Sequence, residues 1–514
     1  MIYRSSEPDV EIPDVTVGEY VLARASGFGD KAAVVDAASG DRLTYRELAD
    51  GAAAAAGALA ALGVRPGQVV AVLSHNQPRY PLAVHAVLAA GAVVTPMNPI
   101  QTTGELAKQL TAAGAVAVIT SEEAAPKAAE AADAAGVGHR FVLGEAAGFR
   151  PFGELTASGA PRPALDLDPA TAIAVLPFSS GTTGPAKGVR LTHRNLVANL
   201  VQTAAGWRVA EDDVVAGVLP FFHAYGFTII MNSALPAGAT VVTAPRYSLA
   251  GFLRMVQEHR VTRAFLAPPM VLGLSTSDEV SGYDLSSLRL AICGAAPLDV
   301  EVTERAESKL GCLIRQGYGM TEASPGTHAV PDAEFAATPP GSIGRLLPST
   351  EARLVDPATG EDAAAGKAGE LWIRGPQVMA GYLDNPGATA DTLVEGGWLR
   401  TGDIVRRDES GVFWVVDRLK ELIKYKGYQV APAELESVLL AHPRVRDAAV
   451  VGMPHTEGGE APKAFVVPAA PVDAEELMAW VADRVAPYKK VRAVEFLDEI
   501  PRSAAGKILR RRLR

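Results

Sequence analysis

Short apolar runs alternate with helix-patterned stretches through residues 15–170, and this rhythm constrains the fold more than any other feature of the chain. The expected strands are residues 32–35, 69–73, 116–120 and 140–143. The expected helices are residues 45–62 and 77–90. Strands that alternate with helices in this way form parallel sheets covered by helices. The sequence therefore predicts an α/β fold whose large N-terminal domain contains parallel-rich sheets wrapped by helices.

The length and composition describe a globular protein of more than one domain. With 514 residues the chain exceeds what one hydrophobic core ordinarily holds, so at least two domains are expected. Hydrophobic residues make up 48% and charged residues 21%, which is the balance of a soluble protein. Two cysteines, Cys293 and Cys312, are too few for a disulfide framework and favour a reducing cytoplasm.

Neither a targeting segment nor a membrane span is expected from the sequence. Residues 1–15 are polar and acidic, without the apolar core of a signal peptide. The apolar stretches at residues 51–64 and 81–94 are interpreted as buried helices, because neither is long enough to cross a bilayer. The C-terminal residues also lack the Ser-Lys-Leu address of peroxisomes. We therefore expect a cytoplasmic protein without integral membrane association.

Charge is distributed unevenly along the chain. The net charge of −10 argues against nucleic acid as the main partner. Residues 418–514 hold 17 Lys or Arg against 13 Asp or Glu, whereas the preceding 417 residues hold 31 against 45. A basic end on an acidic body is either a solvated surface bias or a lid that brings cations to an anionic ligand.

A glycine-rich loop, residues 179–188, follows a strand-like run at residues 171–178 and precedes a helix-like run from about Thr192. Its glycines permit close approach to a ligand, while its hydroxyls, backbone N–H groups and Lys187 suit a polyphosphate. The loop departs from the Walker A pattern, because Lys187 is followed by Gly188. A solvent-exposed turn is the alternative interpretation of this composition.

The segment at residues 219–226 places a histidine within an aromatic cluster. His223 has no His, Cys or carboxylate near it at metal-ligand spacing, so we reject a metal site there. Packing or helix capping is the ordinary role of a lone histidine. Alternatively, His223 and Tyr225, with the apolar helix expected at residues 227–235, line a pocket for an apolar acid.

Three further segments carry candidate ligand contacts. A strand at residues 289–293 is followed by small residues, which form either a tight turn or the space that a flat ligand needs. In residues 316–322 an aromatic ring suited to base stacking precedes Glu322, which beside a triphosphate is a natural Mg²⁺ ligand. Asp403, which follows a glycine, is either a structural turn residue or an acceptor for ribose hydroxyls.

A domain boundary is expected near Asp417, where residues 418–426 carry four cations. Beyond it lies a small α/β unit. Its expected helices and strands are residues 432–441 (helix), 445–452 (strand), 474–485 (helix) and 491–497 (strand). Lys507 follows in a loop of Gly, Ser and Ala, where it is either a solvated cation or a mobile catalytic one.

Taken together, these segments resemble the adenylate-forming superfamily of acyl- and aryl-CoA synthetases, peptide-synthetase adenylation domains and beetle luciferases. The resemblance covers nearly the whole chain, with the motifs in the family order, and it is strongest to 4-coumarate–CoA ligases. The stretches that carry it are SSGTTGPAKGV (179–189), LPFFHAYG (219–226), QGYGMTEASPGTH (316–328), GELWIRG (369–375), DRLKELIKYKGYQVAPAELE (417–436) and PRSAAGKILRR (501–511).

The resemblance implies a two-step ligase that uses ATP, Mg²⁺ and CoA. A carboxylate first attacks the α-phosphate of ATP, giving acyl-AMP and pyrophosphate; the lid then rotates, and the CoA thiol attacks the acyl carbon. The implied domains are residues 1–416, which bind ATP and the acid, a hinge at residues 417–420, and a C-terminal lid at residues 421–514.

The resemblance also assigns residues to the first step. Lys507 neutralises the junction of carboxylate and phosphate, Asp403 binds the ribose with help from Arg418, and Glu322 positions Mg²⁺ with Thr183. The implied phosphate-binding positions are Ser179, Ser180, Gly181, Thr182, Thr183, Gly184 and Lys187. The positions implied around adenine and the acyl phosphate are Ala295, Ala296, Gln316, Gly317, Tyr318 and Thr321.

For the second step, the resemblance implies that the lid presents a different face. The positions implied for this step are Lys424 and Gln429 near the acyl-adenylate, Lys426 and Gly427 at the CoA channel, and Arg246 at the CoA nucleotide. Lys420, in the hinge, joins the implied ligand-binding positions, and His223 joins the catalytic ones.

The acid pocket is implied to contain His223, Tyr225, Ile229, Ala295 and Gly317. Ile229 stands where plant coumarate ligases commonly have a polar serine, which favours a cinnamate-like or other apolar acid over one with a 4-hydroxyl. The alternatives are a ligase for medium- or long-chain fatty acids and an adenylation enzyme that loads a carrier protein. The expected partners are the acid, ATP and CoA, and the expected assembly is a monomer or a homodimer.

Overall fold

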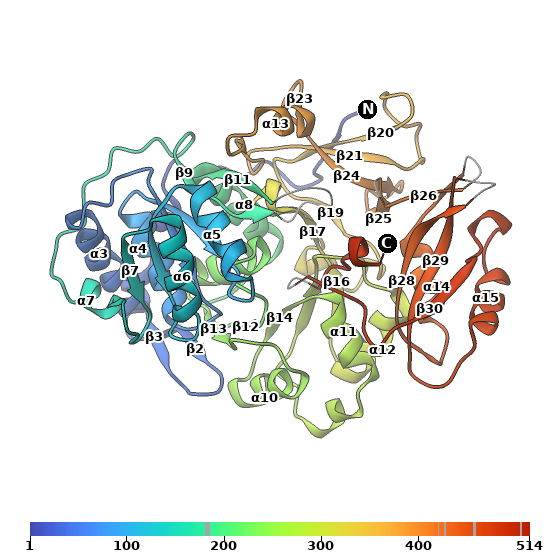
Figure 1. Cartoon of the computed structure of the whole chain (residues 1–514), viewed down its shortest axis with the longest axis horizontal. Coiled ribbons are helices and arrows are strands. Elements are labelled where there is room, and N and C mark those ends of the chain that lie inside the picture. The colour runs from blue at the N-terminus through green and yellow to red at the C-terminus, as the bar shows by residue number, and fades with distance from the viewer. Residues whose placement is uncertain (180–185, 420, 426–427, 456–458, 504–505, 514) are drawn as a thin grey trace.

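The computed structural model describes residues 1–179, 186–419, 421–425, 428–455, 459–503 and 506–513. It is an α/β structure with a large N-terminal domain and a small C-terminal domain, which confirms the predicted fold class. Figure 1 shows the C-terminal domain, in orange and red, at one end of the molecule beside β25. No helix within the described ranges is long and apolar enough to cross a membrane.

A mostly parallel sheet of seven strands forms one layer of the N-terminal domain. Each neighbouring pair in it is parallel except the last, β2 and β3. In spatial order its strands are β16 (Leu313–Gln316), β15 (Leu290–Cys293), β14 (Arg263–Leu266), β12 (Val214–Gly217), β13 (Thr240–Thr243), β2 (Ala32–Asp36) and β3 (Arg42–Thr44). Because parallel strands end at the same edge, the loops after β15 and β16 lie side by side.

A second sheet of nine strands carries the glycine-rich loop at one edge. Its strands are β10 (Phe178–Ser179), β11 (Lys187–Thr192), β9 (Ile173–Val175), β5 (Val93–Met97), β4 (Val69–Leu73), β6 (Ala115–Thr120), β7 (His139–Val142), β8 (Arg150–Pro151) and β22 (Gly381–Tyr382), which pairs with β11. Strands β4 to β8 pair in parallel, whereas β10, β11 and β22 pair antiparallel.

Two sequence predictions in this sheet are wrong in their extent. Residues 81–94 do not form one buried helix: Gly91 adopts a left-handed φ of 75°, and Val93 already belongs to β5. The strand expected at residues 171–178 is divided into β9 and β10, with Pro177 between them. Proline has no N–H to donate to a neighbouring strand, which explains the interruption.

Antiparallel sheets complete the N-terminal domain. The six-stranded sheet comprises β1 (Tyr3–Arg4), β20 (Glu351–Val355), β21 (Gly369–Arg374), β24 (Trp398–Arg407), β23 (Leu393–Val394) and β25 (Phe413–Arg418). The three-stranded sheet comprises β17 (Tyr318–Gly319), β18 (Gly326–Ala329) and β19 (Arg345–Leu346). Strand β17 follows directly on β16, so the two sheets meet at the loop that holds Gly317.

Helices cover these sheets, and several begin at a threonine that satisfies the first free N–H groups. Thr16, Thr44, Thr102 and Thr192 each form a reciprocal capping box with the residue three positions on. The α-helices of the N-terminal domain are α1 (Val17–Leu22), α2 (Ala25–Phe28), α3 (Tyr45–Ala61), α4 (Arg79–Ala89), α5 (Thr103–Ala113), α6 (Ala125–Ala135), α7 (Phe152–Thr156), α8 (His193–Gly206), α9 (Ser233–Ala237), α10 (Leu249–His259), α11 (Pro268–Thr276), α12 (Val300–Leu310) and α13 (Pro386–Thr392).

The apolar helix expected at residues 227–235 is wound differently from the prediction. Residues Tyr225–Asn232 form a π-helix, and α9 continues from Ser233. A π-helix carries an extra residue per turn and frequently marks a functional site. Hydrophobic periodicity cannot reveal it, because nearly every side chain of the segment is buried.

The C-terminal domain has its own sheet and its own core. Strands β27 (Tyr428–Val430), β26 (Ile423–Tyr425), β29 (Gly459–Pro468), β28 (Val445–His455) and β30 (Ala493–Phe496) form the sheet, with helices α14 (Pro432–Leu440) and α15 (Ala474–Ala482). The Arg510 guanidinium forms ion pairs with Glu421 at 2.8 Å and Glu436 at 2.6 Å. These pairs anchor the C-terminal residues to the start of the domain and to α14.

Candidate active site

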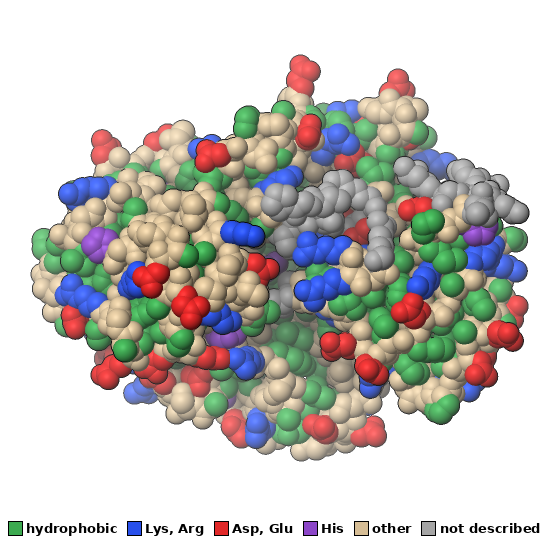
Figure 2. All heavy atoms as spheres, in the orientation of Figure 1, with side chains coloured by type: hydrophobic (Ala, Val, Ile, Leu, Met, Phe, Trp, Pro, Cys, Tyr) green, Lys and Arg blue, Asp and Glu red, His purple; other side chains and the backbone are tan. Residues whose placement is uncertain are grey.

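A cleft of about 610 Å³ lies between the two domains, a size within the range of ligand-binding sites. The N-terminal domain contributes the loops after β15 and β16, together with Asp403 of β24. The C-terminal domain contributes α14 and the segment around Lys507. Figure 2 shows a hollow near the centre of one face, with Lys and Arg side chains beside it. Arg502, Lys507 and Arg510 of the C-terminal domain line the cleft, together with carboxylates from both domains, among them Asp403 and Glu436.

The loops after β15 and β16 bring Ala295, Ala296, Gln316 and Gly317 together in the lining of the cleft. The N–H of Gly317 donates to the carbonyl of Cys293 over 3.0 Å, which joins the two loops. Gln316 Oε1 accepts from the N–H of Leu298 at 2.9 Å, so its side chain serves the turn itself. Tyr318, which follows Gly317, also lines the cleft.

Tyr318 and Asp403 form the next wall of the cleft. The Tyr318 hydroxyl donates to Asp403 Oδ2 at 2.5 Å, and the Asp403 carboxylate is 6% exposed. Asp403 also pairs through its backbone with Arg418 in the adjoining strand. A carboxylate held in this way still has lone pairs for further donors, such as the two hydroxyls of a ribose.

A second carboxylate, Glu322, lies where the glycine-rich loop begins. It is buried, and its Oε1 accepts from the Tyr382 hydroxyl at 2.9 Å and from Ser179 Oγ at 3.4 Å. Lys187 Nζ lies 4.9 Å from the centroid of the Tyr382 ring. Burial and the neighbouring carboxylate raise the pKa of Tyr382. The structure therefore brings Ser179, Lys187 and Glu322 together around one tyrosine.

Sequence reasoning missed Tyr382. It belongs to β22, which pairs with β11 beyond the loop, and it is separated from Glu322 by 60 positions. The short segment around it carries no motif that marks a ligand site, so only the pairing of β22 with β11 reveals the contact.

Lys507 reaches the cleft because its loop packs against the N-terminal domain. Gly506 has a left-handed φ of 80°, and a Cβ on it would lie 3.0 Å from Pro269 Cδ at the start of α11. A side chain at this position is therefore disfavoured both by conformation and by space. The Lys507 N–H is held by Ser503 Oγ at 3.2 Å, and its side chain lines the cleft.

His223 is kept neutral by its surroundings. Burial and, to a lesser degree, the charge of Lys507 lower the pKa of His223 to about 4. A neutral ring offers one donor and one acceptor, so it adds hydrogen bonding without a further positive charge.

An apolar wall stands next to His223. A Cβ on Gly294 would lie 2.9 Å from Tyr225 Cε1, so glycine is required for the ring to pack there. The Tyr225 hydroxyl donates to the carbonyl of Ile292 at 3.2 Å, and its ring meets Phe265 edge-on. Ile229, one turn further along the π-helix, is 2% exposed. The structure thus groups Tyr225 with the loop after β15, whereas Ile229 is deeply packed.

Arg246 lies apart from the cleft. It forms an exposed ion pair with Glu123. Exposed pairs of this kind are weak, so the pair leaves the guanidinium accessible to a stronger anion.

Several predicted positions fall outside the described residues. These are Ser180, Gly181, Thr182, Thr183, Gly184, Lys420, Lys426 and Gly427, together with the side chains of Arg418, Lys424 and Gln429. The backbones of Lys424 and Gln429 face each other in the β26–β27 hairpin. Thr321 begins the short 3₁₀ turn that carries Glu322.

A metal held entirely by protein groups does not occur in the part of the chain that the structure describes, where no three His, Cys, Asp or Glu side chains cluster. Glu322 supplies one buried carboxylate, and Ser179 adds a hydroxyl oxygen near it. Hard oxygen donors in small number suit Mg²⁺, which is bound through one or two carboxylates and the phosphates of a substrate. The donor set therefore fits a magnesium nucleotide.

Buried histidines give the fold a predicted sensitivity to acid. Burial lowers the pKa of His85 and His193 to about 4 and that of His328 to about 3. The unfolded chain binds these protons near pH 6.5 and the folded chain does not, so stability should fall as the pH drops from about 6.5 to about 4. Each histidine adds about 1.4 kcal/mol per pH unit to this slope.

Urea unfolding at several pH values between neutral and mildly acidic checks this expectation. His85→Gln should make the free energy of unfolding depend less steeply on pH, by about 1.4 kcal/mol per pH unit, which is what one histidine contributes. An unchanged slope in a folded variant would show that His85 is protonated in the native protein.

Comparison with known proteins places the chain in a family. The AMP-binding enzyme family matches residues 21–383, and its C-terminal domain matches residues 434–507. A 4-coumarate–CoA ligase from Oryza sativa subsp. japonica is 40% identical over 523 residues, covering 100% of this chain and 97% of the relative. ATP-bound MatB from Rhodopseudomonas palustris has a TM-score of 0.87 at 30% identity, covering 97% of this chain and 98% of its own.

The anthranilate CoA ligase AuaEII in complex with anthranoyl-AMP has a TM-score of 0.89 at 25% identity and covers 98% of this chain and 97% of its own. These matches span both domains. The chain belongs to the AMP-binding enzyme family of ATP-dependent, adenylate-forming acid–CoA ligases.

Proposed function

We propose that the protein joins an apolar aromatic acid of the cinnamate or 4-coumarate type to CoA, in two steps that share one cleft. In the first step the carboxylate oxygen attacks the α-phosphorus of ATP, which forms acyl-AMP and releases pyrophosphate. In the second the CoA thiol, losing its proton, attacks the acyl carbon and AMP departs. The observation that carries this proposal is the position of Lys507, which lines the same cleft as Asp403 and Gly317.

The first step is limited by repulsion between two anions, the carboxylate and the triphosphate. Positive charge at their junction lowers this barrier without covalent help from the protein. Lys507 supplies that charge from the C-terminal domain, and Lys187 supplies another at the glycine-rich loop. His223, neutral at physiological pH, orients the carboxylate through a hydrogen bond.

Nucleotide binding in this scheme uses the remaining walls. Asp403 accepts the ribose hydroxyls with help from Arg418, and the surface of Ala295, Gly317 and Tyr318 receives the adenine. Glu322 and Thr183 would hold Mg²⁺, which supplies charge neutralisation to the phosphates when bound. The residues of the glycine-rich loop bind the β- and γ-phosphates through N–H and hydroxyl groups.

The second step needs another face of the C-terminal domain. Strand β25 pairs with β24 of the large domain, whereas β26 pairs with β29 of the small one, so the chain crosses between domains after Arg418. This crossing supports a hinge at residues 417–420, a body at residues 1–416 and a lid at residues 421–514. Rotation about the hinge withdraws Lys507 and presents the hairpin that carries Lys424 and Gln429. Lys426, Gly427 and Arg246 then meet CoA.

The acid class follows from the apolar wall beside His223. Tyr225 supplies aromatic surface with Phe265 packed edge-on against it, and Ile229, which is deeply packed one turn further along, offers no hydrogen-bonding group for a 4-hydroxyl. A buried hydroxyl without a partner costs about 1–3 kcal/mol. We therefore expect cinnamate to be preferred over 4-coumarate.

Purified protein given ATP, Mg²⁺, CoA and a panel of acids tests the proposal, with pyrophosphate and CoA thioester both measured. Cinnamate should give both products, at a higher kcat/KM than 4-coumarate or decanoate. Release of pyrophosphate without formation of thioester would indicate that a carrier protein, and not CoA, accepts the acyl group. A preference for decanoate would identify a fatty acid ligase instead.

A further inference from the structure

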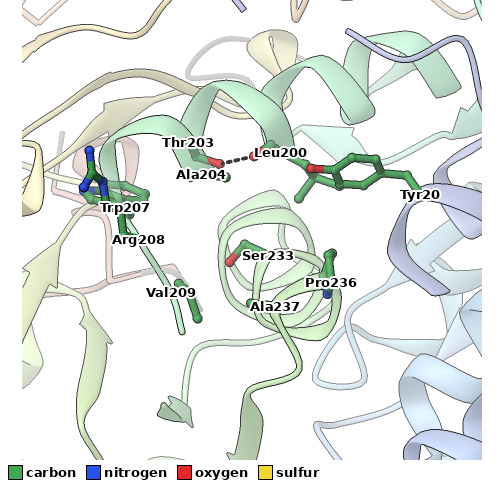
Figure 3. Close-up of a pocket in the computed structure, with 10 residues that line it drawn as sticks. All are labelled: Tyr20, Leu200, Thr203, Ala204, Trp207, Arg208, Val209, Ser233, Pro236 and Ala237. Atoms are coloured by element: carbon green, nitrogen blue, oxygen red, sulfur yellow. Dashed lines mark hydrogen bonds between the residues drawn. The ribbon is translucent and has the colours of Figure 1, made fainter. Parts of the chain in front are cut away.

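A second cavity, of about 320 Å³, opens on the surface behind the acid-binding wall. Figure 3 shows it between α8, the chain that follows α8, and the helix that carries Ser233 and Ala237, with Tyr20 of α1 at one side. Its lining combines apolar residues such as Leu200, Val209 and Pro236 with the polar residues Thr203, Arg208 and Ser233. Nothing in the two-step reaction uses this cavity.

Trp207 and the backbone of Gly317 lie between the second cavity and the cleft. Its indole lines the second cavity, and a Cβ built on Gly317 would lie 3.5 Å from the Cζ2 and Cη2 atoms of the same ring. Gly317 lines the cleft. Trp207 itself does not line the cleft, so the indole and the backbone of Gly317 together form the partition at this point.

The partition is held rigidly in place. Trp207 Nε1 donates to the carbonyl of Val330 at 2.9 Å, and the ring meets Phe265 edge-on with centroids 5.8 Å apart. Phe265 in turn meets Tyr225, so Trp207, Phe265 and Tyr225 form one aromatic row. The row begins at the acid wall and ends at the second cavity. An indole that is fixed at both its polar and its apolar edge cannot swing aside at little cost.

The helix that follows Tyr225 connects the same two places. Tyr225 and Ile229 lie on its π-helical part, while Ser233, Pro236 and Ala237 belong to α9 and line the second cavity. Ser233 Oγ donates to the carbonyl of Ile229, which ties the two parts together. Four residues of helix advance by about 6 Å. The second cavity therefore lies within about one helical turn of the acid wall.

We propose that Trp207 sets the maximum length of the acid, and that the cavity behind it is the space that a longer apolar chain would occupy if the indole were absent. This rests on the proposed function, because it assumes that the acid lies with its carboxylate at Lys507 and His223. The aromatic row then meets the distal end of the substrate. Single-ring acids fit in front of the indole, and long alkyl chains are stopped by it.

The test compares straight-chain acids from butanoate to tetradecanoate, using pyrophosphate release as the readout for the wild type, Trp207→Ala and Trp207→Leu. Both variants should move the optimum of kcat/KM to longer acids, with a gain of about tenfold or more for the longest. Leucine is included because removing a whole buried indole destabilises a core, and thermal unfolding shows which variants are folded.

Ala237→Phe provides a matched control, because it fills the second cavity from the opposite side. In the Trp207→Ala background it should cancel the gain for long acids. On its own it should leave the wild-type length profile unchanged, because the intact indole already excludes substrate from that cavity.

Two outcomes would overturn the inference in an active protein. One is an unchanged length optimum in folded Trp207 variants; the other is a loss of kcat/KM that is equal for all acids, as a merely structural role would give. Failure of the proposed function is a different result: the wild type itself would release no pyrophosphate with any of the acids.

Discussion

Replacement of Lys507 with alanine should reduce acyl-AMP formation by about 10²–10³-fold and leave the conversion of supplied acyl-AMP to acyl-CoA largely unchanged. The magnitude is that of removing one electrostatic group from a transition state. Lys507 lines the same cleft as Asp403, and we propose that its charge lies where the carboxylate attacks. In the second step no triphosphate is present, so this charge is no longer required.

The two half-reactions can be measured separately. Pyrophosphate release reports the first, and thioester formation from synthetic acyl-AMP and CoA reports the second. Lys463→Ala is a suitable control, because Lys463 is another cation of the C-terminal domain and pairs with Glu495 at 2.6 Å, away from the cleft. If both half-reactions fall equally in Lys507→Ala, the assignment of Lys507 to the first step alone is wrong.

Glu322→Gln should lower the rate of adenylation by about 10²–10³-fold and raise the Mg²⁺ concentration needed for half of the maximal rate. The change keeps the shape of the side chain and removes its negative charge. Glu322 is a buried carboxylate whose Oε1 lies 3.4 Å from Ser179 Oγ, where the glycine-rich loop begins. Its loss leaves the oxygen donors there without a charge to attract the cation.

A titration of Mg²⁺ at saturating ATP and acid measures both effects. Glu334→Gln should leave the Mg²⁺ dependence unchanged, because Glu334 forms an ion pair with Arg345 and does not line the cleft. Tyr382→Phe removes one hydrogen bond to Glu322 and should cause a smaller loss than Glu322→Gln. An unaltered Mg²⁺ requirement in Glu322→Gln would remove this residue from the metal site.

The fold class could be predicted from the sequence because each parallel strand is a local apolar run. Residues 69–73 form β4 with the bounds that the sequence suggested. Prediction failed where neighbouring elements are equally apolar, as at residues 81–94, where a helix passes into β5 around Gly91. The π-helix at Tyr225–Asn232 could not be predicted either, because nearly all of its side chains are buried and show no periodicity.

The site could be predicted where a motif places its members close together in sequence, as for Gln316 and Gly317. Contacts across long separations needed the structure. Tyr318 and Asp403 are 85 positions apart, and Trp207 meets the loop of Gly317 because α8 packs against β18, whose His328 also lies beside Gly317. Trp207 also stands outside every recognised motif, so its position carries no signal in the sequence.

The central claim is that the acid is activated as an adenylate, and one measurement tests it directly. The protein is incubated with ATP, Mg²⁺ and cinnamate without CoA, the bound products are analysed by mass spectrometry, and CoA is then added. Cinnamoyl-AMP and pyrophosphate should accumulate to the concentration of enzyme, and CoA should convert the adenylate to thioester with release of AMP. Formation of ADP and an acyl phosphate, or a thioester that appears without an adenylate, would contradict the account.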